Sequence, residues 1–403
     1  MSDHIEFIQK YLSPIFKDEG FQGNISNLFF NKILSLLRSK ITHDLPKVMN
    51  HPEVYSHYVR ELIQFDNKML ESFAFEDLFI SDLILKSEEK FEKWIKVELD
   101  FALGRLDTLA SSPDSWKIRF QQSIENDKIP VIADLFVNLL KAITEYYRDI
   151  LFINVKKDIA CRLQKPIIFS FIEKLNIQMD KSMNDKLKNF CMVCNSARFV
   201  FDEIESWKDD LLFLSIDEND FIFNDCLSLL NSTLNQVALA IVDLQLESYK
   251  SFIRPFYRKR RLSFNEIDSQ QSIADILLEI QKFLDSVGQF VEFADFKSIS
   301  RSLVSGIEND IIEFAINPFH LNFEEAAALN KIIVEPLTSL FANYSSRYLN
   351  KLNAIIQLLM LLPSDPIIKE IQNSIDENNS SELFKLTGLT VDVAKQYIQK
   401  RKN

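Results

Sequence analysis

Apolar residues recur at intervals of three and four along most of the chain. The clearest run follows Pro130 and continues for about five turns, and similar runs occupy residues 221–244 and 329–348. This period places apolar side chains on one face of an α-helix, and alternating patterns long enough to build a sheet are absent from the sequence. The sequence therefore predicts an all-α fold, with Pro336 as a local kink in the third run.

The segment from Glu92 to Trp116 is dense in charge and holds two of the chain's three tryptophans. Read as a helix, it places Trp94, Phe101 and Leu106 on one side and most of its charged residues on the remaining surface. It lacks the spacing of a metal site, a phosphate-binding loop or an activated nucleophile. We therefore expect Trp94, Phe101 and Trp116 to fix packing between helices or neighbouring bundles, with a direct partner contact as the alternative.

The composition favours a folded, helical protein over a nucleotide-binding or nucleic-acid-binding one. Of 403 residues, 47% are hydrophobic and 26% are charged, which is typical of a soluble, folded chain. Only 6 glycines and 11 prolines are present, which favours long helices with short connections and disfavours nucleotide-binding loops. The net charge of -12 argues against a protein that binds nucleic acid through its general charge.

The places where the periodicity fails predict a domain organisation. No repeat with a period of about 30 to 50 residues is visible, so irregular bundles stacked end to end fit better than a regular solenoid. The predicted regions are an N-terminal helical bundle at residues 1–125, a middle helical bundle at 126–253, a basic linker at 254–272 and a C-terminal helical bundle at 273–403.

The four cysteines are Cys161, Cys191, Cys194 and Cys226, too few for a disulfide scaffold, and they indicate a reducing compartment. Cys191 and Cys194 form a C-x-x-C pair, but no second pair of Cys or His lies at zinc-site spacing and no strand precedes the pair. We interpret both as small core residues on a helix, with a metal or redox centre as the alternatives. The sequence assigns no catalytic, cofactor-binding or metal-binding residue.

The sequence suggests no membrane anchor or secretory signal. The first residues, MSDHIEFIQKYLSPIF, are amphipathic and carry acids, unlike a signal peptide. The most lipid-like run, residues 354–363, is less than half the roughly 20 residues that a spanning helix requires. We interpret this run as a buried helix end stopped by Pro363 and expect any membrane contact to be peripheral.

The strongest electrostatic feature is a basic cluster in the predicted linker, interleaved with Phe256 and Tyr257. Three interpretations are open: a solvated loop that offsets local acidity, a contact with an anionic membrane or an acidic partner, and nucleic-acid binding or nuclear import. Ser263 follows paired arginines and is a candidate basophilic kinase site whose phosphate would lower the charge of the cluster. The basic cluster consists of Arg254, Arg258, Lys259, Arg260 and Arg261.

Four segments resemble, in the same order, stretches of the RINT-one/Tip-twenty family of endoplasmic-reticulum vesicle-tethering subunits. The third segment departs from the family pattern, because its sequence N-F-E-E-A-A at residues 322–327 has no glycine, and this predicts a different local turn. The segments are helix-surface signatures rather than catalytic motifs. They are KWIKVELDFALGRLD at 93–107, FVNLLKAITEYYRDI at 136–150, HLNFEEAAALNKIIVEPLTSLFANY at 320–344 and VDVAKQYIQKRK at 391–402.

The resemblance implies an elongated rod of stacked helical bundles, of the type called CATCHR, without enzymatic activity. Such a protein would be a peripheral subunit of the NRZ or Dsl tethering complex on the cytoplasmic face of the endoplasmic reticulum, with the Golgi as a second location. It would act in Golgi-to-ER retrograde vesicle transport and bind an ER SNARE of Sec-twenty type and other tether subunits, but no nucleic acid and no cofactor.

The resemblance does not extend to the N-terminal helical segment through which such subunits pair with the Zeste-white-ten/Dsl subunit. The chain therefore corresponds to a C-terminal region or a short form of the family, and this pairing is an open question. A general helical scaffold or adaptor with a basic interaction loop is the alternative function.

Overall fold

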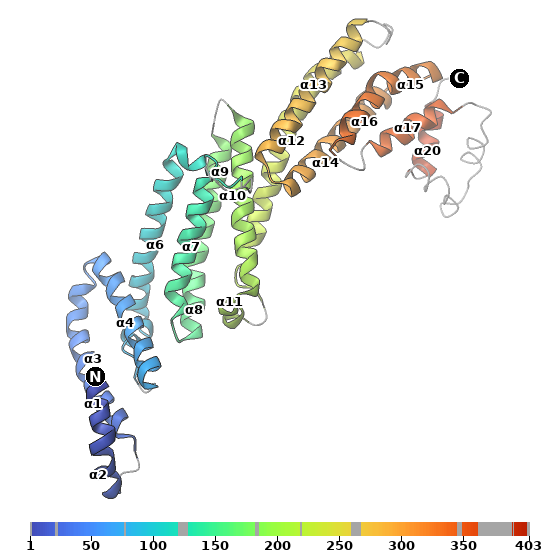
Figure 1. The fold of residues 1–403 in the computed structure, drawn as a ribbon. Coiled ribbons are helices and arrows are strands. Elements are labelled where there is room, and N and C mark those ends of the chain that lie inside the picture. Colours follow the sequence, from blue (N-terminus) through green and yellow to red (C-terminus); the bar gives the residue numbers. More distant parts are fainter. Residues whose placement is uncertain are drawn as a thin grey trace. The chain divides into compact units, whose positions relative to one another are not determined.

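The structure, a computed structural model, consists of helices joined by turns and loops in the part of the chain that it describes (Figure 1). An isolated β-bridge joins Ile118 and Pro130, and no β-strand is present within the described ranges. The predicted all-α class is therefore confirmed. The described residues are 2–20, 23–75, 78–119, 128–181, 185–217, 220–258, 267–344, 349–361, 389 and 391–400.

The chain forms two compact units, and neither is continuous in sequence. The bundle boundaries predicted above follow the chain order and stay a prediction. Unit 1 consists of Met1–Lys117, Val131–Asn176 and Arg198–Asn231, and unit 2 consists of Ile118–Pro130, Ile177–Ala197 and Ser232–Asn403.

Unit 1 is built mainly of helices that run up and down beside one another (Figure 1). The first are α1 (Ser2–Phe7), the π-helical segment η1 (Ile8–Leu12), α2 (Ser13–Asp18), α3 (Ile25–Val48), α4 (Pro52–Phe73), α5 (Asp82–Leu85), α6 (Glu88–Ser111) and the 3₁₀ turn η2 (Pro113–Trp116). They are followed by α7 (Val131–Arg148), α8 (Ile153–Ile159), the π-helical segment η3 (Ala160–Gln164), the 3₁₀ turn η4 (Trp207–Asp209) and α11 (Leu211–Ile216).

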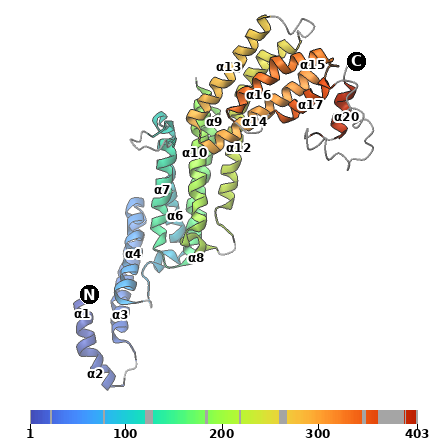
Figure 2. The same cartoon turned by 45° about the vertical axis from the view of Figure 1, so that its right-hand side comes forward.

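Three long helices contribute residues to both units: α9 (Lys165–Asp180), α10 (Lys186–Ser206) and α12 (Asn224–Arg258). The remaining helices of unit 2 follow α12 in the chain (Figure 2). They are α13 (Ile267–Phe290), α14 (Phe293–Ile311), the π-helical segment η5 (Ile312–Ile316), α15 (Phe323–Leu329), the π-helical segment η6 (Asn330–Val334), α16 (Glu335–Ala342), α17 (Asn350–Met360) and α20 (Val391–Gln399).

The apolar run after Pro130 forms α7, as predicted. The face that contains Ile132, Phe136 and Leu140 is fully buried, and the Phe136 ring stacks on Phe171 of α9 with centroids 4.0 Å apart. Further along the same face, the buried Tyr147 hydroxyl donates a hydrogen bond to Gln164. Apolar side chains spaced three and four residues apart along α7 thus form part of the core of unit 1.

Prolines mark three of the π-helical segments. Pro14, Pro166 and Pro336 each occupy the second position of the α-helix that follows such a segment. A proline inside a helix lacks an N–H group and crowds the carbonyl four residues earlier, and the wider π turn accommodates this. Pro336 therefore does interrupt the α-helical run at the predicted place, and the interruption is a π-helical turn at 330–334.

The segment that departs from the family pattern begins a helix. The Asn322 side chain accepts a hydrogen bond from the Glu325 N–H at 2.7 Å, and the Glu325 carboxylate accepts from the Asn322 N–H at 3.0 Å. This reciprocal arrangement is a capping box, which satisfies backbone donors at the start of α15.

Unit 2 contains a close helix–helix contact at a glycine. A methyl group at Gly306 of α14 would lie 2.6 Å from a methyl carbon of Leu246 on α12. A larger residue at this position would require the Leu246 side chain to shift. The chain has only 6 glycines, and the close packing against Leu246 accounts for the one at position 306.

The segment between the two helices is shorter than the linker predicted at residues 254–272. Helix α12 continues to Arg258 and α13 begins at Ile267, so both helices extend into the range 254–272. The buried Tyr257, at 5% exposure, shows why α12 continues, because its side chain joins the core of unit 2.

Candidate functional site

The first site residues to place are those of the tryptophan-rich segment. Trp94 is buried on α6, and its indole N–H donates a hydrogen bond to Glu98 at 3.1 Å. The Ser56 hydroxyl and the Arg60 guanidinium of α4 donate to the same carboxylate, the latter at 3.0 Å. Arg60 also lies 3.9 Å from the centre of the Tyr146 ring on α7. This Glu98 cluster fixes α4, α6 and α7 to one another.

The prediction for the two tryptophans is confirmed, but the one for Phe101 is wrong. Trp116 is buried, and its indole N–H donates to the Ala110 carbonyl at 3.1 Å, which closes the end of α6. Phe101 is 44% exposed, whereas Trp94, Ala102 and Leu106 of the same helix are buried. The structure therefore gives packing roles to the tryptophans and leaves Phe101 on the surface.

Of the basic cluster, the structure describes only the Arg254 side chain. Its guanidinium donates to Asp310 at 3.1 Å and lies 4.2 Å from the centre of the Phe314 ring. Arg258 is the last residue of α12, and its side chain is outside the described part of the chain. Lys259, Arg260, Arg261 and Ser263 also lie outside the described residues. Contact of this cluster with an acidic partner or an anionic membrane stays a prediction.

Arg254 is part of a buried polar cluster rather than a free surface charge. The Asp310 carboxylate is 2% exposed, and burial raises its pKa, although Arg254 acts in the opposite direction. One of its oxygens, Oδ2, has no hydrogen-bond partner. The hydroxyls of Tyr249 and Tyr257 lie 3.0 Å apart in the same unit, both buried. This Asp310 cluster holds the last turns of α12 against α14.

The sequence analysis did not find Glu98 or Asp310. A signal for Glu98 exists, because it stands four residues after Trp94, the spacing at which side chains on a helix meet. No comparable signal marks Asp310, whose partner lies 56 residues away in the sequence.

The two cysteines of the C-x-x-C pair lie on a helix and pack into the protein core, as interpreted from the sequence. Cys191 and Cys194 on α10 are free thiols and are both buried. Burial raises the pKa of Cys191 to about 12, which keeps it in the unreactive thiol form near neutral pH. Among the described residues, no group of three or more His, Cys, Asp or Glu side chains could hold a metal ion.

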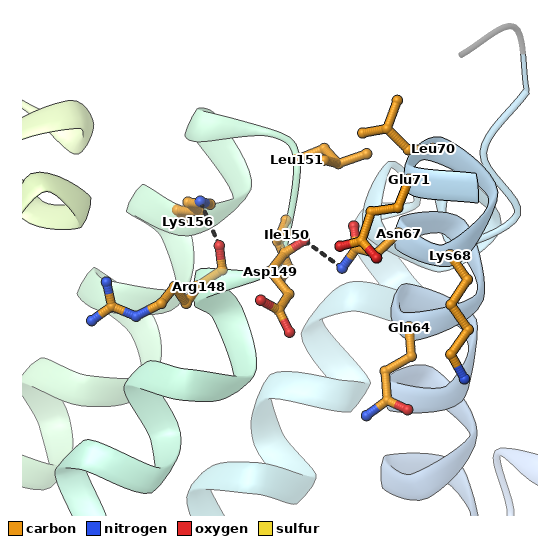
Figure 3. Close-up of a pocket in the computed structure, with 10 residues that line it drawn as sticks. All are labelled: Gln64, Asn67, Lys68, Leu70, Glu71, Arg148, Asp149, Ile150, Leu151 and Lys156. Atoms are coloured by element: carbon orange, nitrogen blue, oxygen red, sulfur yellow. Dashed lines mark hydrogen bonds between the residues drawn. The ribbon is translucent and has the colours of Figure 1, made fainter. Parts of the chain in front are cut away.

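A surface recess of about 510 Å³ lies in unit 1 between α4 and the turn that joins α7 to α8 (Figure 3). One face of α4 contributes Gln64, Asn67, Lys68 and Glu71, and the turn contributes residues 148–151. The Asn67 amide donates to the Asp149 carbonyl at 2.8 Å, and the two elements are joined there.

Two of the cations that line this recess, Arg148 and Lys156, are already engaged. Arg148 is paired with Asp210 at 2.9 Å, and Lys156 donates to the Arg148 carbonyl at 2.8 Å. Burial, helped by the Arg148 charge, lowers the pKa of Lys156. The lining residues thus join α4 to the turn between α7 and α8, and no described nucleophile among them is held by a base.

Helix α12 is the one described helix that is long and apolar enough over Asn224–Arg254 to cross a membrane. Length and composition alone are weak evidence, because the core helix of a soluble protein passes the same test. Leu230, Val237 and Ile241 of this helix are fully buried, and 39% of its most apolar stretch is buried inside the structure.

Comparison with known proteins assigns a family. A family model described as the RINT-1/TIP-1 family matches residues 1–401. The RINT1-like protein of Drosophila melanogaster is 22% identical over 213 residues, which are 52% of this chain and 29% of the fly protein. The chain therefore spans less than a third of that relative. Because the family model covers almost every residue, the chain belongs to the RINT-1/TIP-1 family.

Proposed function

We propose that this chain is a non-enzymatic subunit of a multisubunit tethering complex in Golgi-to-ER retrograde vesicle transport. It acts as a peripheral protein on the cytoplasmic face of the endoplasmic reticulum. It binds an ER SNARE of Sec-twenty type and other subunits of the tether. The match of the family model to residues 1–401 carries this proposal.

The chemistry of the described residues supports a binding function. Polar side chains with structural partners, such as Glu98 and Asp310, join helices to one another. The cysteines that could have formed a redox or metal centre are core residues of α10.

A binding experiment tests the proposal. The purified 403-residue chain, shown to be helical by circular dichroism, is titrated by calorimetry with the cytosolic part of the Sec-twenty-type SNARE. We expect saturable binding with one site. An unrelated SNARE cytosolic domain of similar length is the matched control and should give no heat of binding.

Absence of binding by a folded chain would contradict the SNARE assignment. Localisation then provides an independent check, because the tether function requires the chain at the endoplasmic reticulum. Nuclear staining instead would favour the scaffold alternative, for which the basic cluster is the main support.

A further inference from the structure

Helix α3 carries an excess of positive charge in an acidic chain. It contains four cations, Lys32, Arg38, Lys40 and Lys47, and one carboxylate, Asp44, which gives the helix a formal charge of +3. The whole chain has a net charge of -12. The sign of the charge on α3 is therefore opposite to that of the chain as a whole.

Three of these cations lie on the solvent-exposed face of α3. Phe30 and Leu34 are buried on the opposite face of the helix. At about 100° per residue, Lys32, Lys40 and Lys47 point within about 80° of one another and away from the buried face. At about 1.5 Å per residue, they extend along roughly 22 Å of the helix. Their ammonium groups thus form a row on one side of α3.

The fold supplies no negative charge to this row. Burial and the nearby Asp44 carboxylate raise the pKa of Tyr58 on α4, so Asp44 lies on the side of α3 that packs against α4. No exposed residue of α3 is acidic. Lys32, Lys40 and Lys47 make no ion pair with any described residue. The charge of the row is therefore available to an anionic partner.

Two leucines are exposed beside the lysines. Leu28 is 49% exposed and Leu36 is 73% exposed, and both point within about 40° of Lys32. The hydroxyls on this side are satisfied within the helix, because Ser35 donates to the Lys32 carbonyl at 2.7 Å and Ser39 to the Ser35 carbonyl at 3.0 Å. The exposed face of α3 thus combines ammonium groups with aliphatic side chains.

We propose that this α3 face, defined by Leu28, Lys32, Leu36, Lys40 and Lys47, binds the anionic phospholipid surface of a membrane. The ammonium groups attract the lipid phosphates and carboxylates. Because lysine side chains are long, the leucines can enter the headgroup region while the charges stay at its surface. A charge spread along one convex helix face, rather than gathered in a pocket, suits a plane of headgroups.

The expected strength follows from the three lysines. Each lysine close to an anionic leaflet increases partitioning by about fivefold, so three increase it by about a hundredfold. Attraction of this kind weakens as salt screens the charges. The inference rests on the proposed function for the identity of the membrane, and it supplies the surface of the proposed peripheral contact.

Sedimentation of the purified full chain with lipid vesicles tests the inference. One set of vesicles contains phosphatidylcholine alone, and the other also contains phosphatidylserine at about 30% of the lipid. We expect the chain to bind the anionic vesicles at least about tenfold more strongly at low salt. Raising the salt concentration to about 0.5 M should release it.

A triple variant removes the charges of the α3 face. Lys32→Gln, Lys40→Gln and Lys47→Gln together should lower partitioning into anionic vesicles by about a hundredfold. Thermal unfolding followed by circular dichroism should stay unchanged, because these side chains form no ion pair in the described fold.

A matched control removes the same charge elsewhere. Lys96→Gln, Lys282→Gln and Lys331→Gln neutralise three exposed lysines on three different elements, α6, α13 and η6. This control should lower partitioning by less than about threefold, because its lysines do not share one face with exposed leucines. It separates a specific surface from the general charge of the chain.

Three outcomes would overturn the inference. The first is equal binding of the wild-type chain to neutral and anionic vesicles, or binding to neither. The second is an equal loss of binding in the triple variant and its control. The third is a wild-type chain that ignores vesicles but needs the α3 lysines to bind the SNARE, because the partner of this face would then be an acidic protein.

The SNARE titration distinguishes failure of this inference from failure of the proposed function. A triple variant that loses vesicle binding but keeps the wild-type affinity for the SNARE supports both. A wild-type chain that binds anionic vesicles through α3 but not the SNARE supports the lipid contact and contradicts the SNARE assignment.

Discussion

Two carboxylates, one in each unit, are paired with an arginine that also covers an aromatic ring. In unit 1, Arg60 bonds Glu98 at 3.0 Å and lies over Tyr146. In unit 2, Arg254 bonds Asp310 at 3.1 Å and lies over Phe314. Both clusters join helices that are far apart in the sequence, so the two can be compared directly.

The clusters differ in how completely the carboxylate is satisfied. Glu98 accepts hydrogen bonds from Ser56, Arg60 and Trp94, and its side chain is 10% exposed. Asp310 is 2% exposed, has Arg254 as its described side-chain donor and leaves Oδ2 without a partner. A buried charge is costly unless it is paired and hydrogen-bonded. The Glu98 cluster is therefore tolerant of losing one donor, and the Asp310 cluster is not.

The largest expected effect is the loss of Arg254. Arg254→Met leaves the Asp310 carboxylate buried without its ion-pair partner, which should lower the free energy of unfolding by about 3–5 kcal/mol. Arg60→Met should cost only about 1 kcal/mol, because Glu98 keeps the Ser56 and Trp94 donors. Urea denaturation followed by circular dichroism measures both values.

The double variant Arg254→Met with Asp310→Leu separates charge from packing. It should recover most of the lost stability, because no unpaired charge remains in the core. Equal losses for Arg254→Met and Arg60→Met would contradict the difference between the two clusters.

A second prediction concerns the helix contact next to the Asp310 cluster. Gly306→Ala should destabilise unit 2 by about 1 kcal/mol, because the Leu246 side chain must shift away from a methyl group that would lie 2.6 Å from it. Gly288→Ala is the matched control, since its methyl group would meet Phe296 at an ordinary 3.5 Å. Thermal unfolding of both variants makes the comparison, and a destabilised control with an unchanged Gly306→Ala would show that the close approach is unimportant.

A third, smaller effect tests the donors to Glu98. Trp94→Phe keeps the aromatic ring but removes the indole N–H, and it should cost about 1 kcal/mol. A double-mutant cycle with Glu98→Gln measures the coupling between the two side chains. Zero coupling would mean that the hydrogen bond contributes nothing beyond the burial of the ring.

The smallest effect is a difference in pH dependence. Hydrogen bonding to Arg148 lowers the pKa of Asp210, whereas burial raises the pKa of Asp310. Asp210 therefore contributes stability above its unfolded pKa of about 3.9 and loses it as the pH falls through its folded pKa. Asp310 contributes stability below about pH 3.9 and loses it as the pH rises through its higher folded pKa.

Variants of the two aspartates should consequently respond in opposite directions to acid. Asp210→Asn should reduce the loss of stability between pH 7 and pH 3, and Asp310→Asn should make that loss steeper. Urea midpoints at four pH values in this range measure both slopes. The same change of slope in both variants would contradict the opposite pKa shifts.

Helix identity and core faces were predictable to a large extent. The apolar run that became α7 buries Ile132, Phe136 and Leu140, because a local spacing of three and four is enough to define one face. Pro336 predicted an interruption at the correct place, since its effect on the backbone is also local. The exposure of Phe101 was missed because it depends on where α4 begins alongside α6.

By itself, the sequence determined the helical class, the buried side of the long helices and, through four ordered segments, the family. Only the tertiary structure decided that Arg254 pairs with Asp310 and Arg60 with Glu98, and that Phe101 stays exposed. The physical reason is distance along the chain. Periodicity acts over neighbouring turns of one helix, whereas a buried ion pair joins residues 38 or 56 positions apart and depends on how the helices pack.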